Sequence, residues 1–116
     1  MVENLIKIYL NDNNTIIIPV SELPVFDFTL IDNAEVNYYS IKMRIAKNTG
    51  ERVKYNYLEE IWKEIQKYPA KEINKIEIIQ SNSVVYTMKN VFKIYYQIDF
   101  LDTYLGEYIE FNMRKK

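Results

Sequence analysis

The residue types that most often carry out chemistry in proteins are missing from this chain of 116 residues. The sequence contains no cysteine and no histidine. Thiolate catalysis, an imidazole base and the usual nitrogen or sulfur metal sites are therefore excluded. An active site would have to be built from carboxylates, lysine, tyrosine or serine.

Three pairs of acids have a spacing that could support acid–base or metal chemistry. They are Glu59 with Glu60, Glu60 with Glu64, and Asp99 with Asp102. Paired acids at a helix start or beside a turn usually serve as capping and solvated groups. The "DFLD" spacing also lacks the regular ligand alternation and central glycine of a calcium loop. We therefore expect no metal site.

The remaining candidates for catalysis are weaker still. Ser81 and Ser83 lie in the polar segment "QSNS", and no lysine is spaced to act as their base. The sequence has only two glycines, Gly50 and Gly106, and contains no phosphate-binding loop, nucleophile elbow or dinucleotide motif. We expect a protein that is not an enzyme and that has no cofactor.

The composition indicates one ordinary globular domain spanning residues 1–116. Apolar residues make up 48% of the chain and charged residues 27%, while tyrosine occurs eleven times. A chain rich in Tyr, Ile and Val and poor in Gly favours strands. The first twenty residues are interrupted by "NDNN" and lack a basic start, so they predict neither a signal peptide nor a membrane span. We expect a soluble, intracellular protein.

Alternating apolar residues predict strands along most of the chain. "LIKIYLNDNNTIIIPV" predicts a hairpin with an Asn/Asp turn, and Pro19 predicts that its second arm lies at a sheet edge or ends near Val20. Further alternation occurs in "VFDFTLID", "EVNYYSIKMRIAK", "KIEIIQ", "SVVYTMKN", "VFKIYYQIDF" and "EYIEFNMRK". In "SVVYTMKN" the even positions, Val84 included, form the apolar face.

One segment has helical periodicity instead. In "NYLEEIWKEIQKYP" a single apolar stripe predicts a helix over about 57–68, with Asn56 as the N-cap and Pro69 as the stop. The stripe consists of Leu58, Ile61, Trp62, Ile65 and Tyr68. Because the strands do not alternate with helices, the predicted class is α+β: a mostly antiparallel sheet of about seven or eight short strands with this helix packed on one face.

The segment "VFKIYYQIDF", residues 91–100, contains enough rings and charge to suggest a platform for nucleotide bases. Its even positions form an apolar face made of Phe92, Ile94, Tyr96, Ile98 and Phe100. The opposite face has Lys93, Tyr95, Gln97 and Asp99, and the aspartate would repel phosphate. This pattern favours a core strand over a base-stacking platform.

Charge is unevenly distributed although the net charge is −1. Residues 1–40 contain six acids and one base, and residues 41–75 contain nine bases and five acids. This predicts a two-ended molecule able to associate head to tail, so a homo-oligomer is one expected form. The positive segment is too short to predict strong binding of duplex DNA.

The C-terminal strands "KIEIIQSNSVVYTMKNVFKIYYQIDF" and "GEYIEFNMRK" resemble the strand meander of small virion proteins, of the tail or neck, in tailed phages and prophages. The resemblance covers about a third of the chain and implies a structural component of a virion, located in the virion or in the cytoplasm of a bacterial host cell. It transfers no functional residue.

Three functions remain open. The first is a non-catalytic protein-binding or assembly protein, whose partner is itself, another virion protein or a host protein. The second is a small phage-type inhibitor, anti-defence or anti-CRISPR-like, that binds a host nuclease or other host protein. The third and weaker one is nucleic-acid binding. The candidate interaction surface consists of basic residues and exposed tyrosines: Lys42, Arg44, Lys47, Arg52, Lys54, Tyr95, Tyr104 and Tyr108.

Overall fold

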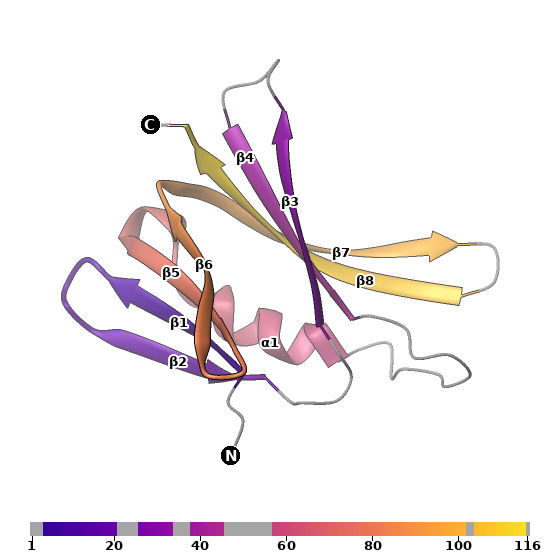
Figure 1. Ribbon diagram of the computed structural model, residues 1–116, viewed down its shortest axis with the longest axis horizontal. Coiled ribbons are helices and arrows are strands. Elements are labelled where there is room, and N and C mark those ends of the chain that lie inside the picture. Colours follow the sequence, from indigo (N-terminus) through magenta and orange to yellow (C-terminus); the bar gives the residue numbers. More distant parts are fainter. Residues whose placement is uncertain (1–3, 21–25, 34–37, 46–56, 102–103, 116) are drawn as a thin grey trace.

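A computed structural model describes residues 4–20, 26–33, 38–45, 57–101 and 104–115 (Figure 1). These residues form mostly antiparallel sheet with one α-helix, which confirms the predicted α+β class. The elements are β1 (Leu5–Leu10), β2 (Thr15–Pro19), β3 (Phe26–Asn33), β4 (Tyr38–Ile45), α1 (Tyr57–Ile65), the 3₁₀ turn η1 (Ala70–Glu72), β5 (Ile73–Gln80), β6 (Ser83–Lys89), β7 (Val91–Leu101) and β8 (Tyr104–Arg114).

The strands form two four-stranded sheets rather than one. Sheet A has the order β2–β1–β5–β6, and sheet B has the order β3–β4–β8–β7. The predicted hairpin is confirmed, because β1 and β2 pair antiparallel from Leu5 opposite Pro19 to Tyr9 opposite Thr15. Pro19 lies in an edge strand, where its missing N–H leaves no ladder bond unmade.

Both sheets contribute one face to a single core. In sheet A the buried side chains alternate along β1. In sheet B every residue of β8 from Glu107 to Met113 is buried, and alternate ones, Ile109, Phe111 and Met113, belong to the core. The fully buried members with less than 2% exposure are Phe111, Ile6, Ile8, Met43, Leu58, Ile65, Ile76, Ile78, Met88 and Ile109. In Figure 1 the sheets lie beside each other, and α1 lies below β7 and β8.

The predicted helix is present but shorter than expected. It spans Tyr57–Ile65, and a turn over the next residues leads through Pro69 into η1. Leu58, Ile61 and Ile65 are buried, as the stripe predicted. Trp62 is only half-buried and stacks on Tyr96 of β7, with ring centroids 6.4 Å apart. The predicted N-cap Asn56 lies outside the described residues.

The passage from β6 of sheet A to β7 of sheet B takes place at a single residue. Asn90 has a positive φ of 60°, and it joins the last residue of β6 to the first residue of β7. Asparagine tolerates this left-handed conformation better than most residues do. The Arg114 N–H donates to the Asn90 carbonyl oxygen at 3.0 Å, which fixes the corner against β8.

Two bulges change which side chains face the core. The β7–β8 register shifts between Val91 and Lys93, so Val91 takes the inner position opposite Met113 and Phe92 turns outward. The β5–β6 register shifts between Ile78 and Ile79, and Val84 is 51% exposed. The sequence-based assignment of Phe92 and Val84 to the apolar face is therefore wrong.

Candidate binding surface

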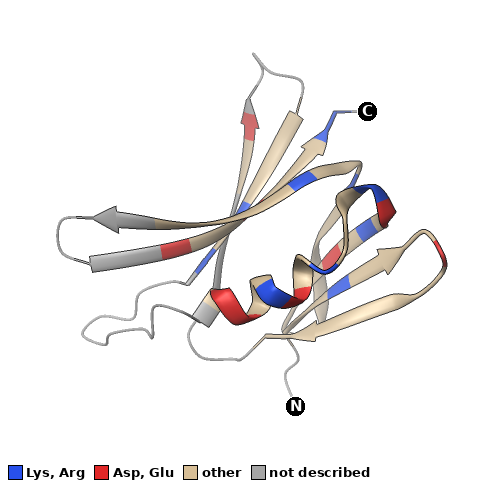
Figure 2. Ribbon diagram, turned by 180° about the vertical axis from the view of Figure 1, so that it is seen from behind, with Lys and Arg blue, Asp and Glu red and all other residues tan. Residues whose placement is uncertain are grey.

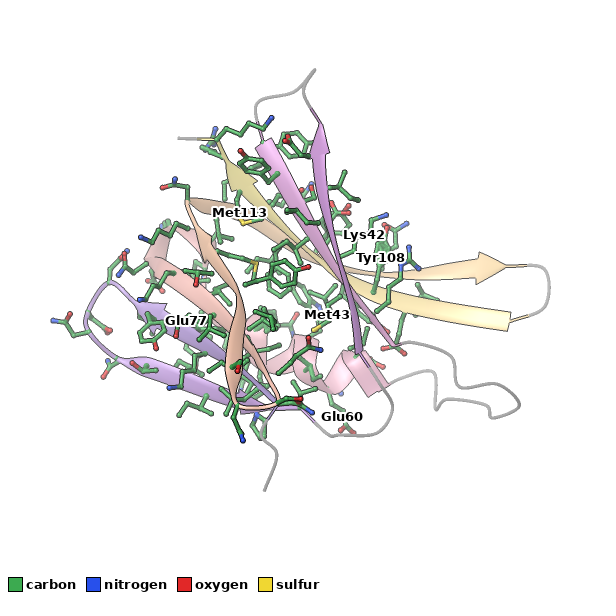
Figure 3. All side chains as sticks on the ribbon, viewed as in Figure 1. Lys42, Met43, Glu60, Glu77, Tyr108 and Met113 are labelled. Carbon is green, nitrogen blue, oxygen red and sulfur yellow. The ribbon has the colours of Figure 1, made fainter. Side chains whose placement is uncertain are left out.

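Four of the predicted interaction residues come together on one side of sheet B. We call the face of β4, β8 and β7 that points away from the core the outer face. Figure 3 shows Met43 and Met113 on the side of sheet A, and Lys42 and Tyr108 on the other side. Alternation along the three strands places their side chains in rows across the sheet.

The first row is built around Tyr108. Arg44 and Gln97 flank it on the neighbouring strands, and its hydroxyl donates to Gln97 Oε1 at 3.0 Å. Lys42 Nζ lies 4.7 Å and Arg44 Cζ 4.9 Å from the centre of the Tyr108 ring. These two cations cover the ring, and Tyr108 is only 6% exposed.

The second row pairs a buried carboxylate with a phenol. The Tyr95 hydroxyl donates to Glu110 Oε2 at 2.6 Å, and Lys42 Nζ lies 4.0 Å from Glu110 Oε1. Burial and the bond to Glu110 raise the pKa of Tyr95 far above its ordinary value. Tyr95 therefore stays protonated and donates its hydrogen bond to Glu110.

The third row is held by neutral polar groups. The Ser40 hydroxyl donates to Asn112 Oδ1 at 2.7 Å, and Asn112 Nδ2 donates to the Lys93 carbonyl oxygen at 3.4 Å. Both side chains are buried. The three rows therefore satisfy their own polar groups and tie β4, β8 and β7 together.

A cluster of rings and a cation lies at the end of the outer face next to Asn90. Phe92, turned outward by its bulge, meets Tyr38 edge to face at 5.8 Å between ring centroids. The Arg114 guanidinium lies 4.7 Å from the centre of the Phe92 ring. Arg114 and Lys93 are both exposed here.

The outcome for the predicted surface is mixed. Lys42, Arg44, Tyr95 and Tyr108 gather as described, but Tyr108 is a buried ring, so its expected exposure is wrong. Lys47, Arg52 and Lys54 lie outside the described residues, and Tyr104 is the first residue of β8. Phe92, Arg114 and Glu110 were not predicted, because the bulge and the strand order that bring them here leave no signal in the sequence.

A pocket opens beside β7, where α1 ends. It has a volume of about 280 Å³ and is lined by residues of the helix end, of η1 and of the first half of β7. The ring-bearing lining residues are Trp62, Tyr68 and Phe92, and the cationic one is Lys93. The pocket and the outer face therefore share Phe92 and Lys93.

Glu107 is a buried carboxyl group with a strongly raised pKa. It lies in β8 on the core side, is 6% exposed, and its Oε1 accepts from the Tyr96 hydroxyl at 3.4 Å. No group among the described residues donates to its Oε2. Burial raises the pKa of Glu107 to about 7, although the backbone N–H groups of Leu58 and Glu59 at the start of α1 act in the opposite direction.

Of the acids considered for chemistry, the structure describes the side chains of Glu59, Glu60 and Glu64. Glu64 pairs with Lys67 at 3.0 Å on the helix surface. Asp102 lies outside the described residues. Within the described ranges no three acidic side chains converge on one point.

Charge is interleaved rather than separated at two ends. The antiparallel register of β3 and β4 puts Asp27 opposite Arg44, and Lys115 of the C-terminal segment pairs with Asp32 at 2.6 Å. Figure 2 shows acidic and basic residues distributed over both sheets and the helix. The predicted two-ended distribution is therefore wrong for the described part of the chain.

Comparison with known proteins gives no further guide to function. No family model matches the chain, and no curated protein or solved structure is significantly similar to it. In the described part of the chain no helix has the length and apolar character needed to cross a membrane.

Proposed function

We propose that this protein is a non-catalytic binding protein that assembles by adding strands at the free edges of its sheets. The observation that carries the proposal is the position of the exposed apolar residues. Apart from Tyr38, the large apolar residues described as exposed all lie on edge strands. They are Ile17 on β2, Leu30 and Ile31 on β3, and Val84 and Val85 on β6.

The β3 edge has the features that strand addition requires. β3 pairs only with β4, so one row of its backbone groups has no partner strand among the described elements. Leu30 is 51% and Ile31 40% exposed, and these consecutive residues point to opposite faces. A strand added at this edge would cover both side chains and pair the backbone.

Natural edge strands usually carry a lysine, a proline or a bulge that prevents such pairing. β2 has Pro19, and the pairing of β6 with β5 is irregular where it passes Ile78 and Ile79 of β5. β3 pairs with β4 in continuous register and contains neither lysine nor proline. We therefore place the assembly contact at β3, with a second copy of the chain or another structural protein as the partner.

Ile31→Lys tests this contact. Lysine at an edge position opposes strand addition, so the variant should remain monomeric at concentrations at which the parent chain associates. Sedimentation velocity over a range of concentrations measures the difference. Asn74→Lys adds the same charge at an exposed position of the central strand β5 and should associate as the parent does. Equal association of both variants, or a parent that is monomeric throughout, would contradict the proposal.

The resemblance of the C-terminal strands to small phage virion proteins supports an assembly role in a virion. The alternative is a phage-type inhibitor that binds a host protein. An inhibitor does not need to self-associate, so sedimentation of the parent chain separates the two functions.

A further inference from the structure

The basic and ring-bearing end of the outer face lies next to the pocket beside β7. Together they are complementary to a ligand that combines rings with negative charge. We propose that this surface binds single-stranded nucleic acid, with one base in the pocket and the backbone along the adjoining cations. The site is separate from the β3 edge, so its test does not depend on whether the assembly contact is correct.

The pocket fits a base in size and lining. Its volume of about 280 Å³ is close to the lower end of ligand sites, which suits a group no larger than a base with its sugar. Trp62, Tyr68 and Phe92 are its ring-bearing lining residues, and Gln66 supplies an amide able to donate and accept hydrogen bonds. Stacking on such rings tolerates any base sequence.

The cations next to the pocket fit a phosphate backbone. Lys93 lines the pocket and is exposed, and Arg114 is exposed where it lies over Phe92. Among the described side chains of this face the one acid is Glu110, which is buried and accepts the hydrogen bond of Tyr95.

The geometry selects single strands over a duplex. A base can enter the pocket only when it is unpaired and unstacked. The rings of Tyr38 and Phe92 next to the cations also give stacking surfaces that the paired bases of a duplex do not offer. An acidic peptide would satisfy Lys93 and Arg114 but would leave the ring-lined pocket empty.

Two titrations of the full chain test the site. Trp62 is the only tryptophan, so its fluorescence reports directly on the pocket. Oligothymidylate of about 15 nucleotides should quench it, and fluorescence anisotropy of the labelled oligonucleotide should show binding that weakens with added salt. A duplex of the same length and poly-L-glutamate should both bind at least tenfold more weakly and leave Trp62 unquenched.

Variants separate the site from general charge attraction. Lys93→Glu combined with Arg114→Glu should weaken binding tenfold or more. The slope of log affinity against log salt concentration should also become shallower by about 1.4, because two phosphate contacts are lost. Phe92→Ala should reduce Trp62 quenching and affinity without changing that slope. Lys63→Glu reverses one charge, as each member of that pair does, at an exposed position of α1 outside the pocket and should bind as the parent does.

Circular dichroism and thermal melting establish that each variant is folded. If the charge reversals lower stability, Lys93→Gln with Arg114→Gln provides the same test. The proposal is overturned if oligothymidylate does not bind, if poly-L-glutamate binds equally well, or if Lys63→Glu weakens binding as much as the paired reversal.

Discussion

Replacing Phe111 by alanine is expected to lower the free energy of unfolding by about 3–5 kcal/mol. Phe111 is the largest fully buried side chain, and it lies in β8 between Ile41 of β4 and Ile94 of β7. Removing its ring would leave a cavity that the surrounding strands cannot close, because their backbones are fixed by ladder hydrogen bonds. Denaturant unfolding followed by circular dichroism measures the loss.

Val84→Ala is the matched control for that measurement. Val84 is also a strand residue, but it is half exposed at the β6 edge, so its truncation should cost no more than about 0.5 kcal/mol. If Phe111→Ala costs as little as Val84→Ala, the two sheets do not share the core described above.

The second large effect concerns Glu107 and pH. Its pKa is raised to about 7 in the folded protein from an ordinary value of 4.5. Between these two pH values the carboxyl is therefore protonated in the folded state and ionised in the unfolded state. The contribution of Glu107 to stability is therefore fully present below about pH 4.5 and is lost as pH rises through about 7. The loss amounts to roughly 3 kcal/mol.

Glu107→Gln removes this dependence while keeping the shape of the side chain. The variant should equal the parent in stability near pH 4.5 and exceed it near pH 8. Other groups face the same site, since Glu59 of α1 and Tyr96 of β7 interact with Glu107, so the quantity to compare is the difference between the two proteins at each pH. A difference that stays constant from pH 4.5 to pH 8 would show that the carboxyl is not protonated in the fold.

Periodicity in the sequence predicted most of the elements and many of their faces. The alternation of Ile109, Phe111 and Met113 correctly assigned the inner face of β8, and the stripe of Leu58, Ile61 and Ile65 correctly assigned the buried side of α1. These predictions succeed because side-chain direction follows from backbone geometry alone.

The division into two sheets and the positions of the bulges could not be predicted. A bulge exists only relative to a partner strand, and the partner of Phe92 is fixed by the long-range pairing of β7 with β8. The even spacing of Phe92 and Ile94 therefore suggested one face for both, although Phe92 lies on the other.

The candidate site suffered from the same limitation. Examined alone, "VFKIYYQIDF" offered Lys93 and Tyr95 beside Asp99 and favoured a core strand over a stacking platform. The fold adds Arg114 from β8 and Tyr38 from β4, and it places Trp62 of α1 next to Phe92 in one pocket. The order of strands and the docking of the helix create this surface, and neither has a local signature.

Hydrogen exchange along β3 tests the assembly account most directly. The account predicts that amides of Phe26–Asn33 gain protection as the protein concentration is raised, while Ile31→Lys exchanges at one rate at all concentrations. Unchanged exchange in β3 across that range, with association still detected by sedimentation, would show that the protein assembles through another surface and would contradict the account.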